Sequence, residues 1–141
     1  RASGDQVKDG AAQVTGASQM LAQGASVPHF HPDDGAMFCF QGQPKPGLWR
    51  HAGDRSHWVS PVFRDLNTFV VRRSGVYLEA LGKPPESILY QHRFDTGRLE
   101  RRLAIPQGIE GGFSVSPDER YLVFASYEIR GSDLWVIENL R

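Results

Sequence analysis

The chain has 141 residues, of which 40% are hydrophobic and 23% are charged, a balance typical of a folded domain and not of a disordered one. Its 16 basic and 16 acidic residues cancel, so no long-range attraction draws it to nucleic acid, and nucleic acid is not expected as a partner. No apolar run is long enough to span a bilayer, so no membrane partner is expected either.

Short apolar segments separated by turn residues predict strands along most of the chain. The segment 27–31 is the first, and it ends at the Pro-Asp-Asp-Gly of residues 32–35. This is a turn signal because proline fixes φ, aspartate bonds nearby backbone and glycine accepts positive φ. Further strands are expected at 36–41 and from 48 to 51, at 69–72, 76–81, 87–94 and 98–105, and at 112–116, 120–127 and 132–140. No stretch has convincing helical periodicity.

Two of these segments are copies of one another. Residues 31–38 align without gaps with residues 116–123, at an offset of 85, and the Leu-Trp pair at Leu48 recurs 86 residues later at Leu134. Half of that offset is close to the roughly 40–45 residues of a four-stranded propeller blade. The repeat therefore predicts an all-β fold, a β-propeller fragment of about three four-stranded antiparallel blades.

A weaker middle copy lies between the two strong ones. Residues 69–78 match residues 113–122 at an offset of 44, although this copy lacks the Pro-Asp pair. An isolated strand at 11–15 is expected to be a fourth strand without a blade of its own. The predicted division is a fourth strand and loop in 1–25, one blade in 26–66, a second in 67–110, and three strands of a third in 111–141.

The last copy carries a family resemblance. Its Ser-Pro-Asp-x-x-x-Leu-x-Phe pattern at residues 116–124 and its Gly-Ser-Asp-Leu-Trp at residues 131–135 resemble the blade repeat of TolB-like, WD-like propellers. Residues 112–140 resemble the C-terminal propeller of bacterial winged-helix regulators. No winged helix lies in these residues, so the resemblance carries no DNA binding to them. It implies a bacterial protein of the cytoplasm or periplasm and leaves the compartment open.

The function expected from this resemblance is a non-catalytic binding module with a protein or peptide partner, part of a larger sensory or regulatory protein. Two alternatives stay open: an accessory propeller domain of a peptidase-like hydrolase, and a self-assembling structural repeat unit. Three blades cannot close a ring, so a second copy or the remainder of a parent chain is expected to complete it. In either case the strand at 11–15 would complete the last blade of that partner.

The chain is not expected to be an enzyme. The Gly-Phe-Ser-Val-Ser of residues 112–116 lacks the final glycine of a nucleophile elbow and lies in a predicted strand. His92, Ser116 and Asp118 make a catalytic triad only if order and geometry are ignored.

The residues most like metal ligands are His29 and His31, which share a strand face, with Asp33 next to them. The repeat explains them without a metal, because His31 aligns with Ser116 and Asp33 is the turn aspartate. No metal and no cofactor are expected. The candidate binding residues, in the channel or on one face, are His31, Arg72 and Ser116.

Two further expectations concern packing and loops. Aromatic residues at strand spacing are expected to form the core between blades; they are Phe38, Phe40, Tyr77, Tyr121 and Phe124. Cys39, the only cysteine, is expected to be a buried packing thiol. The loops 43–46, 83–86 and 128–131 are expected together on one face, as equivalent connections between strands.

Overall fold

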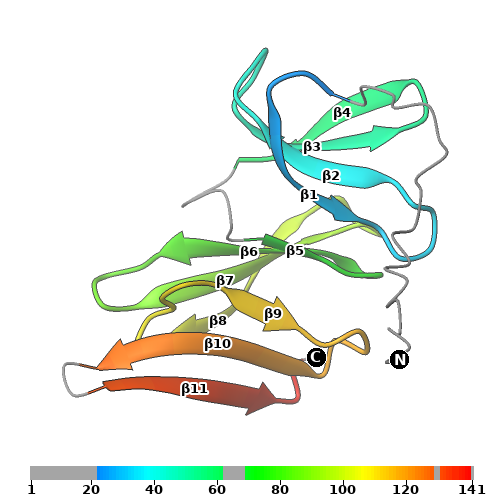
Figure 1. Cartoon of the computed structure of the whole chain (residues 1–141). Coiled ribbons are helices and arrows are strands. Elements are labelled where there is room, and N and C mark those ends of the chain that lie inside the picture. The colour runs from blue at the N-terminus through cyan, green and yellow to red at the C-terminus, as the bar shows by residue number, and fades with distance from the viewer. Residues whose placement is uncertain (1–21, 62–68, 129–130, 141) are drawn as a thin grey trace, which may run out of the picture.

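The structure is a computed structural model in which residues 22–61, 69–128 and 131–140 are described. All the regular elements in these ranges are β-strands, and they form three separate antiparallel sheets (Figure 1). This confirms the all-β prediction. The predicted strand at 11–15 lies outside the described residues, and so do residues 129 and 130 of the third predicted loop.

Each sheet is a simple meander, because neighbouring strands are consecutive in the chain and joined by short connections. The first sheet comprises β1 (Ala25–Phe30), β2 (Met37–Gln41), β3 (Gly47–Ala52) and β4 (Arg55–Ser60). The middle sheet comprises β5 (Phe69–Val71), β6 (Gly75–Leu81), β7 (Ser87–Arg93) and β8 (Leu99–Ile105). The last sheet comprises β9 (Phe113–Val115), β10 (Tyr121–Glu128) and β11 (Gly131–Glu138).

The predicted strands match the observed ones to within two residues at each end. Strand β4 completes the first sheet; the four-stranded blade predicted at 26–66 implies a fourth strand, although no residues were assigned to it. Connections β2–β3 and β6–β7, which contain the predicted loops 43–46 and 83–86, lie on the same side of the molecule in Figure 1. Both join the second strand of a sheet to its third.

One face of the middle sheet packs against the first sheet. Val76 and Leu78 of β6 lie there, two residues apart, because alternate side chains of a strand point to the same face. They are buried together with Phe38 and Leu48 of the first sheet.

The opposite face of the middle sheet packs against the last sheet. Tyr77 of β6 and Leu89 of β7 are buried there with Leu122 and Phe124 of β10. Both faces of β6 are therefore covered, which explains why six of its seven residues are buried and its sequence does not alternate between polar and apolar.

The sheets approach one another most closely at their first strands. Strand β1 contacts β5, and β5 in turn contacts β9. The order of strands within each sheet then places later strands progressively farther from this shared edge. The first strands therefore form the inner edge of the stack.

The expected aromatic core is only partly correct. Phe38, Tyr77 and Phe124 are buried between sheets, whereas Phe40 and Tyr121 are only half-buried. Tyr121 was misassigned because it lies three residues from Phe124 on one strand, so their side chains point to opposite faces.

Cys39 is buried, as predicted. Burial raises the pKa of its thiol, which disfavours the reactive thiolate.

The outer face of the last sheet is exposed and apolar. Tyr127 is 63% exposed and Leu134 is 72% exposed, and Val136 lies beside them on the same face. This contrasts with the middle sheet, which is covered on both sides. Within the part of the chain that the structure describes, this face is the largest group of exposed hydrophobic side chains on one sheet.

Replacing Leu78 with alanine tests the packing between the first two sheets. Leu78 is fully buried, so Leu78→Ala is expected to lower the free energy of unfolding by about 2–5 kcal/mol in urea denaturation. Leu134→Ala removes the same atoms from an exposed site and is expected to change it by no more than about 0.5 kcal/mol. Equal losses from the two variants would contradict the assigned core.

Candidate functional site at the first-strand turns

The turns that follow the three first strands are structurally equivalent. In each, the residue directly after the strand donates its amide to a carbonyl beyond the turn: His31 to Ala36 at 2.8 Å, Arg72 to Gly75 at 2.9 Å, and Ser116 to Tyr121 at 2.9 Å. The three predicted binding residues therefore occupy one position in three sheets. We call these connections (residues 31–36, 72–74 and 116–120) the first-strand turns.

The first and last of these turns are stabilised by their own side chains. The Asp34 carboxylate accepts a hydrogen bond from the Ala36 amide at 2.9 Å. The Ser116 hydroxyl donates to Asp118 at 2.5 Å and accepts from the amide of Tyr121 at 3.0 Å. These are the local bonds that make Asp and Ser common in turns.

Glu119 ties the last sheet to the middle one. Its carboxylate accepts hydrogen bonds from the Ser74 amide at 3.0 Å, from the Ser74 hydroxyl, and from the Tyr77 hydroxyl at 2.8 Å. Glu119 has a φ of 60°, the left-handed region that costs a residue with a side chain about 1–2 kcal/mol. Three donors to one carboxylate offset that cost.

A second tie joins the same two sheets at the end of β9. The Arg72 guanidinium donates to the backbone carbonyl of Val115, through Nε at 2.7 Å and through Nη2. It also donates to the carbonyl of Val71 at 2.8 Å. Arg72 is one of the three candidate binding residues, and its hydrogen bonds hold the edges of two sheets together.

The tie between the first and middle sheets is weaker. Nε of Arg73 lies 2.9 Å from Oδ1 of Asp33, and both side chains are largely exposed to solvent. Exposed ion pairs of this kind contribute little to stability, up to about 1 kcal/mol.

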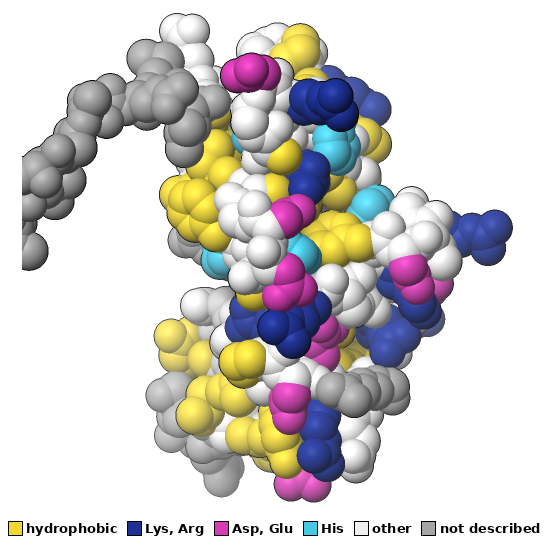
Figure 2. Space-filling model, turned by 90° about the vertical axis from the view of Figure 1, so that its right-hand side faces the viewer, with side chains coloured by type: hydrophobic (Ala, Val, Ile, Leu, Met, Phe, Trp, Pro, Cys, Tyr) yellow, Lys and Arg dark blue, Asp and Glu magenta, His cyan; other side chains and the backbone are white. Residues whose placement is uncertain are grey.

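A cavity of about 490 Å³ opens where the three first-strand turns meet. Its walls come from all three sheets and are Phe30, Pro32, Val71, Arg72, Arg73, Pro117 and Asp118. We call it the turn pocket. Figure 2 views the side of the molecule on which these turns lie, where basic and acidic side chains stand close together with hydrophobic patches between them.

Of the three predicted residues, only Arg72 lines the turn pocket. His31 lines a different cavity, and the Ser116 hydroxyl is engaged within its own turn. Phe30 and Pro117 were not predicted as site residues. Phe30 could have been noticed as an aromatic residue directly before a turn, and Pro117 as the proline of the repeated Pro-Asp pair.

The residues considered as metal ligands are not gathered around one point. The His29 ring packs on Phe69 at 4.6 Å, Nδ1 of His31 lies 3.0 Å from Asp34, and Asp33 pairs with Arg73. Among the residues that the structure describes, no group of three or more His, Cys, Asp or Glu side chains is placed to hold a metal ion.

The three residues considered as a triad are not brought together either. Ser116 bonds to Asp118 within a first-strand turn, whereas His92 lies on β7 and lines the cavity between the first and middle sheets. The described ranges also hold no helix long and apolar enough to cross a membrane.

Comparisons with known proteins add no identification. No family model, no curated protein and no solved structure matches this chain significantly.

Tyr77 provides a direct probe of the Glu119 tie. Burial, the hydrogen bond to Glu119 and its negative charge raise the pKa of Tyr77 to about 12. Glu119→Gln removes the charge but not the burial, so the pKa of Tyr77 is expected to fall and to stay above 10, its ordinary value. A pH titration followed by absorbance measures the pKa of Tyr77, and the Tyr77→Phe variant identifies which transition belongs to this residue. An unchanged transition would show that Glu119 does not face Tyr77.

Ser116 is expected to stabilise its turn and not to act as a nucleophile. Ser116→Ala should lower the free energy of unfolding by about 1 kcal/mol, since the three hydrogen bonds that the Ser116 hydroxyl makes within the turn are lost. The wild-type chain should not hydrolyse a generic ester such as p-nitrophenyl acetate. Ester turnover that disappears in Ser116→Ala would overturn this assignment.

Proposed function

We propose that this chain is an arc of three β-propeller blades that serves as a non-catalytic binding module for a protein or peptide segment. The observation that carries the proposal is the meeting of three equivalent turns, one from each sheet, around the turn pocket. A ligand at this point contacts all three sheets at once, and loops on a rigid scaffold are where binding residues concentrate.

The arrangement of the sheets supports the propeller part of the proposal. Blades of a propeller are meandering antiparallel sheets arranged radially around a central channel. Here each sheet is such a meander, the first strands are adjacent, and the middle sheet packs on a neighbour at each face. The spacing of the sequence repeat agrees with the length of a blade.

A ring needs more blades than this arc contains. We infer that a second copy or the remainder of a parent chain supplies them. The exposed outer face of the last sheet, with Tyr127, Leu134 and Val136, supports this inference, because apolar patches of this kind usually mark an interface.

The chemistry of the turn pocket suits a peptide segment. Phe30, Pro32 and Pro117 offer apolar surface, and charged side chains stand at its rim. An aromatic side chain surrounded by polar rim residues is the usual composition of a peptide or protein contact. We expect the ligand to insert an apolar side chain against Phe30.

The larger context remains a proposal from the sequence resemblance, namely the sensory or regulatory part of a bacterial protein. None of the described side chains specifically supports an accessory hydrolase domain, and the exposed outer face of the last sheet is the one feature that also suits a self-assembling structural repeat unit. The turn pocket favours binding over both.

Phe30 is the residue through which the proposal can be tested. Peptides selected from a displayed library against the folded chain should bind the Phe30→Ala variant at least about tenfold more weakly. Phe30 is 59% exposed, so the substitution should leave the urea midpoint nearly unchanged. Leu81→Ala, at a similarly exposed hydrophobic residue at the end of β6 (61% exposed), should bind normally. Failure to select any peptide, or selected peptides that ignore Phe30→Ala, would refute the proposal.

A further inference from the structure

A larger cavity, of about 680 Å³, lies between the first and middle sheets. We call it the intersheet pocket. It is separate from the turn pocket, although Arg73 lines both. Its volume is within the range of about 300–1,000 Å³ that is usual for small-molecule sites.

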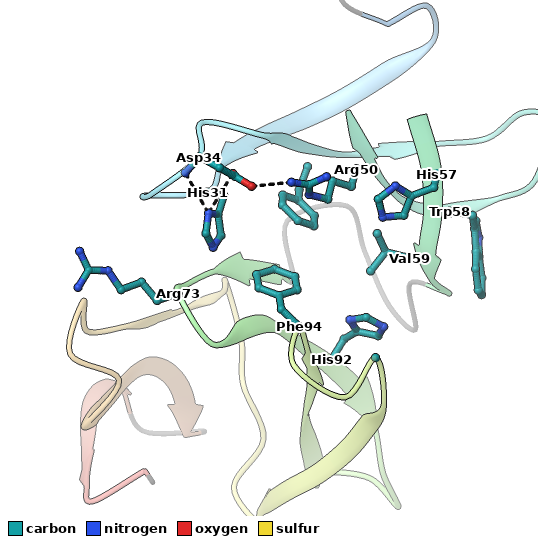
Figure 3. A pocket seen from close by; sticks show the side chains of 11 residues that line it. His31, Asp34, Arg50, His57, Trp58, Val59, Arg73, His92 and Phe94 are labelled. Carbon is teal, nitrogen blue, oxygen red and sulfur yellow. Dashed lines mark hydrogen bonds and ion pairs between the residues drawn. The ribbon is translucent and has the colours of Figure 1, made fainter. Parts of the chain in front are cut away.

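The wall formed by the first sheet carries a row of three side chains, one each from β2, β3 and β4. Phe38, Arg50 and His57 are directly opposite one another on β2, β3 and β4, so their side chains share one face. All three line the intersheet pocket. Figure 3 shows Arg50 and His57 on this wall, above the cavity.

The opposite wall comes from the middle sheet. His92 of β7 and Phe94, which follows that strand, line it. In Figure 3 both side chains lie across the cavity from Arg50 and His57. Nδ1 of His92 is buried and has no hydrogen-bond partner among the described residues.

An aromatic surface forms the apolar part of the pocket. The rings of Phe38 and Phe94 are stacked, with centroids 5.4 Å apart and an interplanar angle of 29°. The His31 ring meets Phe94 edge-on at 5.3 Å. A flat aromatic ring can be added to such a cluster in a stacked or edge-to-face arrangement.

The fixed charges of the pocket are almost balanced. Nη2 of Arg50 lies 2.5 Å from Oδ2 of Asp34, and Arg73 pairs with Asp33 at the rim. Protonation of the two facing imidazoles would leave the pocket positive. Burial, together with the charge of His57, lowers the pKa of His92 and so disfavours its protonation.

We propose that the intersheet pocket binds a small aromatic carboxylate. The ring lies against Phe94, which stacks on the buried Phe38, and the carboxylate lies between Arg50 and His57 on one wall and the imidazole of His92 on the other. An anion in this position offsets the repulsion between cationic groups that face one another. A guanidinium donates hydrogen bonds to a carboxylate in a fixed geometry, and the remaining donors of Arg50 keep the bond to Asp34.

Binding is expected to tighten as the pH falls from about 8 to about 5.5, because a bound carboxylate favours the protonated imidazoles. The charged or titratable groups facing the site are Arg50, Asp34, His31 and His57 from the first sheet, and Arg73 and His92 from the middle sheet. The pKa of Asp34 is held low, chiefly by the hydrogen bond from the Ala36 amide, so its charge is constant over this interval.

Isothermal titration of the full chain with 3-phenylpropionate tests the proposal. The acid should bind at least about tenfold more tightly at about pH 5.5 than its neutral amide, 3-phenylpropionamide. Arg50→Gln should remove this difference. Arg101→Gln, at an exposed arginine of β8 outside the pocket, should retain it. His92→Gln should reduce the pH dependence. Equal binding of acid and amide, or equal effects of the two arginine variants, would overturn the proposal.

Two further measurements complete the test. If Arg50→Gln lowers the urea midpoint, the wild-type imidazole NMR signals decide instead: 3-phenylpropionate should shift those of His57 and His92, and unshifted signals would refute the site. N-acetylphenylalanine mimics the C-terminus of a peptide and should bind more weakly, since its amide meets the apolar wall. Equal or tighter binding would overturn the assignment to a free small acid.

Discussion

Glu119 joins the last sheet to the middle sheet through three hydrogen bonds to Ser74 and Tyr77, and the rest of the arrangement depends on this contact. It lies at the shared inner edge, where the first strands are adjacent, beside the bond from Arg72 to the Val115 carbonyl. Neighbouring sheets pack along their whole faces. Fixing their relative position at this edge therefore determines which side chains come into contact farther from it. The buried pairing of Tyr77 with Leu122 and Phe124 follows from it.

Both candidate pockets lie beside contacts between the sheets. Where the turns themselves meet, short side chains and prolines leave the turn pocket open to solvent. Farther out, between the first and middle sheets, the polar tie found among the described residues is the exposed ion pair of Asp33 and Arg73, and the intersheet pocket lies beyond it. The tightly bonded boundary between the middle and last sheets has a polar pocket, lined by Tyr77, Arg102 and Glu119.

Local turn chemistry made the strands predictable, whereas the site residues depended on contacts that no local pattern contains. The Pro-Asp pairs at Pro32 and Pro117 mark two first-strand turns, and their spacing placed the third. Arg72 was correctly placed at a strand end, but its partner, the carbonyl of Val115, is 43 residues away. His57 reaches its pocket because it pairs directly with Arg50 on β3, whereas the bulge at Val59, which is unpaired between Trp58 and Ser60, lies farther along β4.

A double-mutant cycle between Glu119 and Tyr77 tests most directly whether contacts at the inner edge hold the sheets together. The free energy of unfolding would be measured by urea denaturation for the wild type, Glu119→Gln, Tyr77→Phe and the double variant. The account predicts a coupling energy of about 1 kcal/mol or more between two residues on different sheets. Additive losses, with a coupling within about 0.3 kcal/mol of zero, would contradict it.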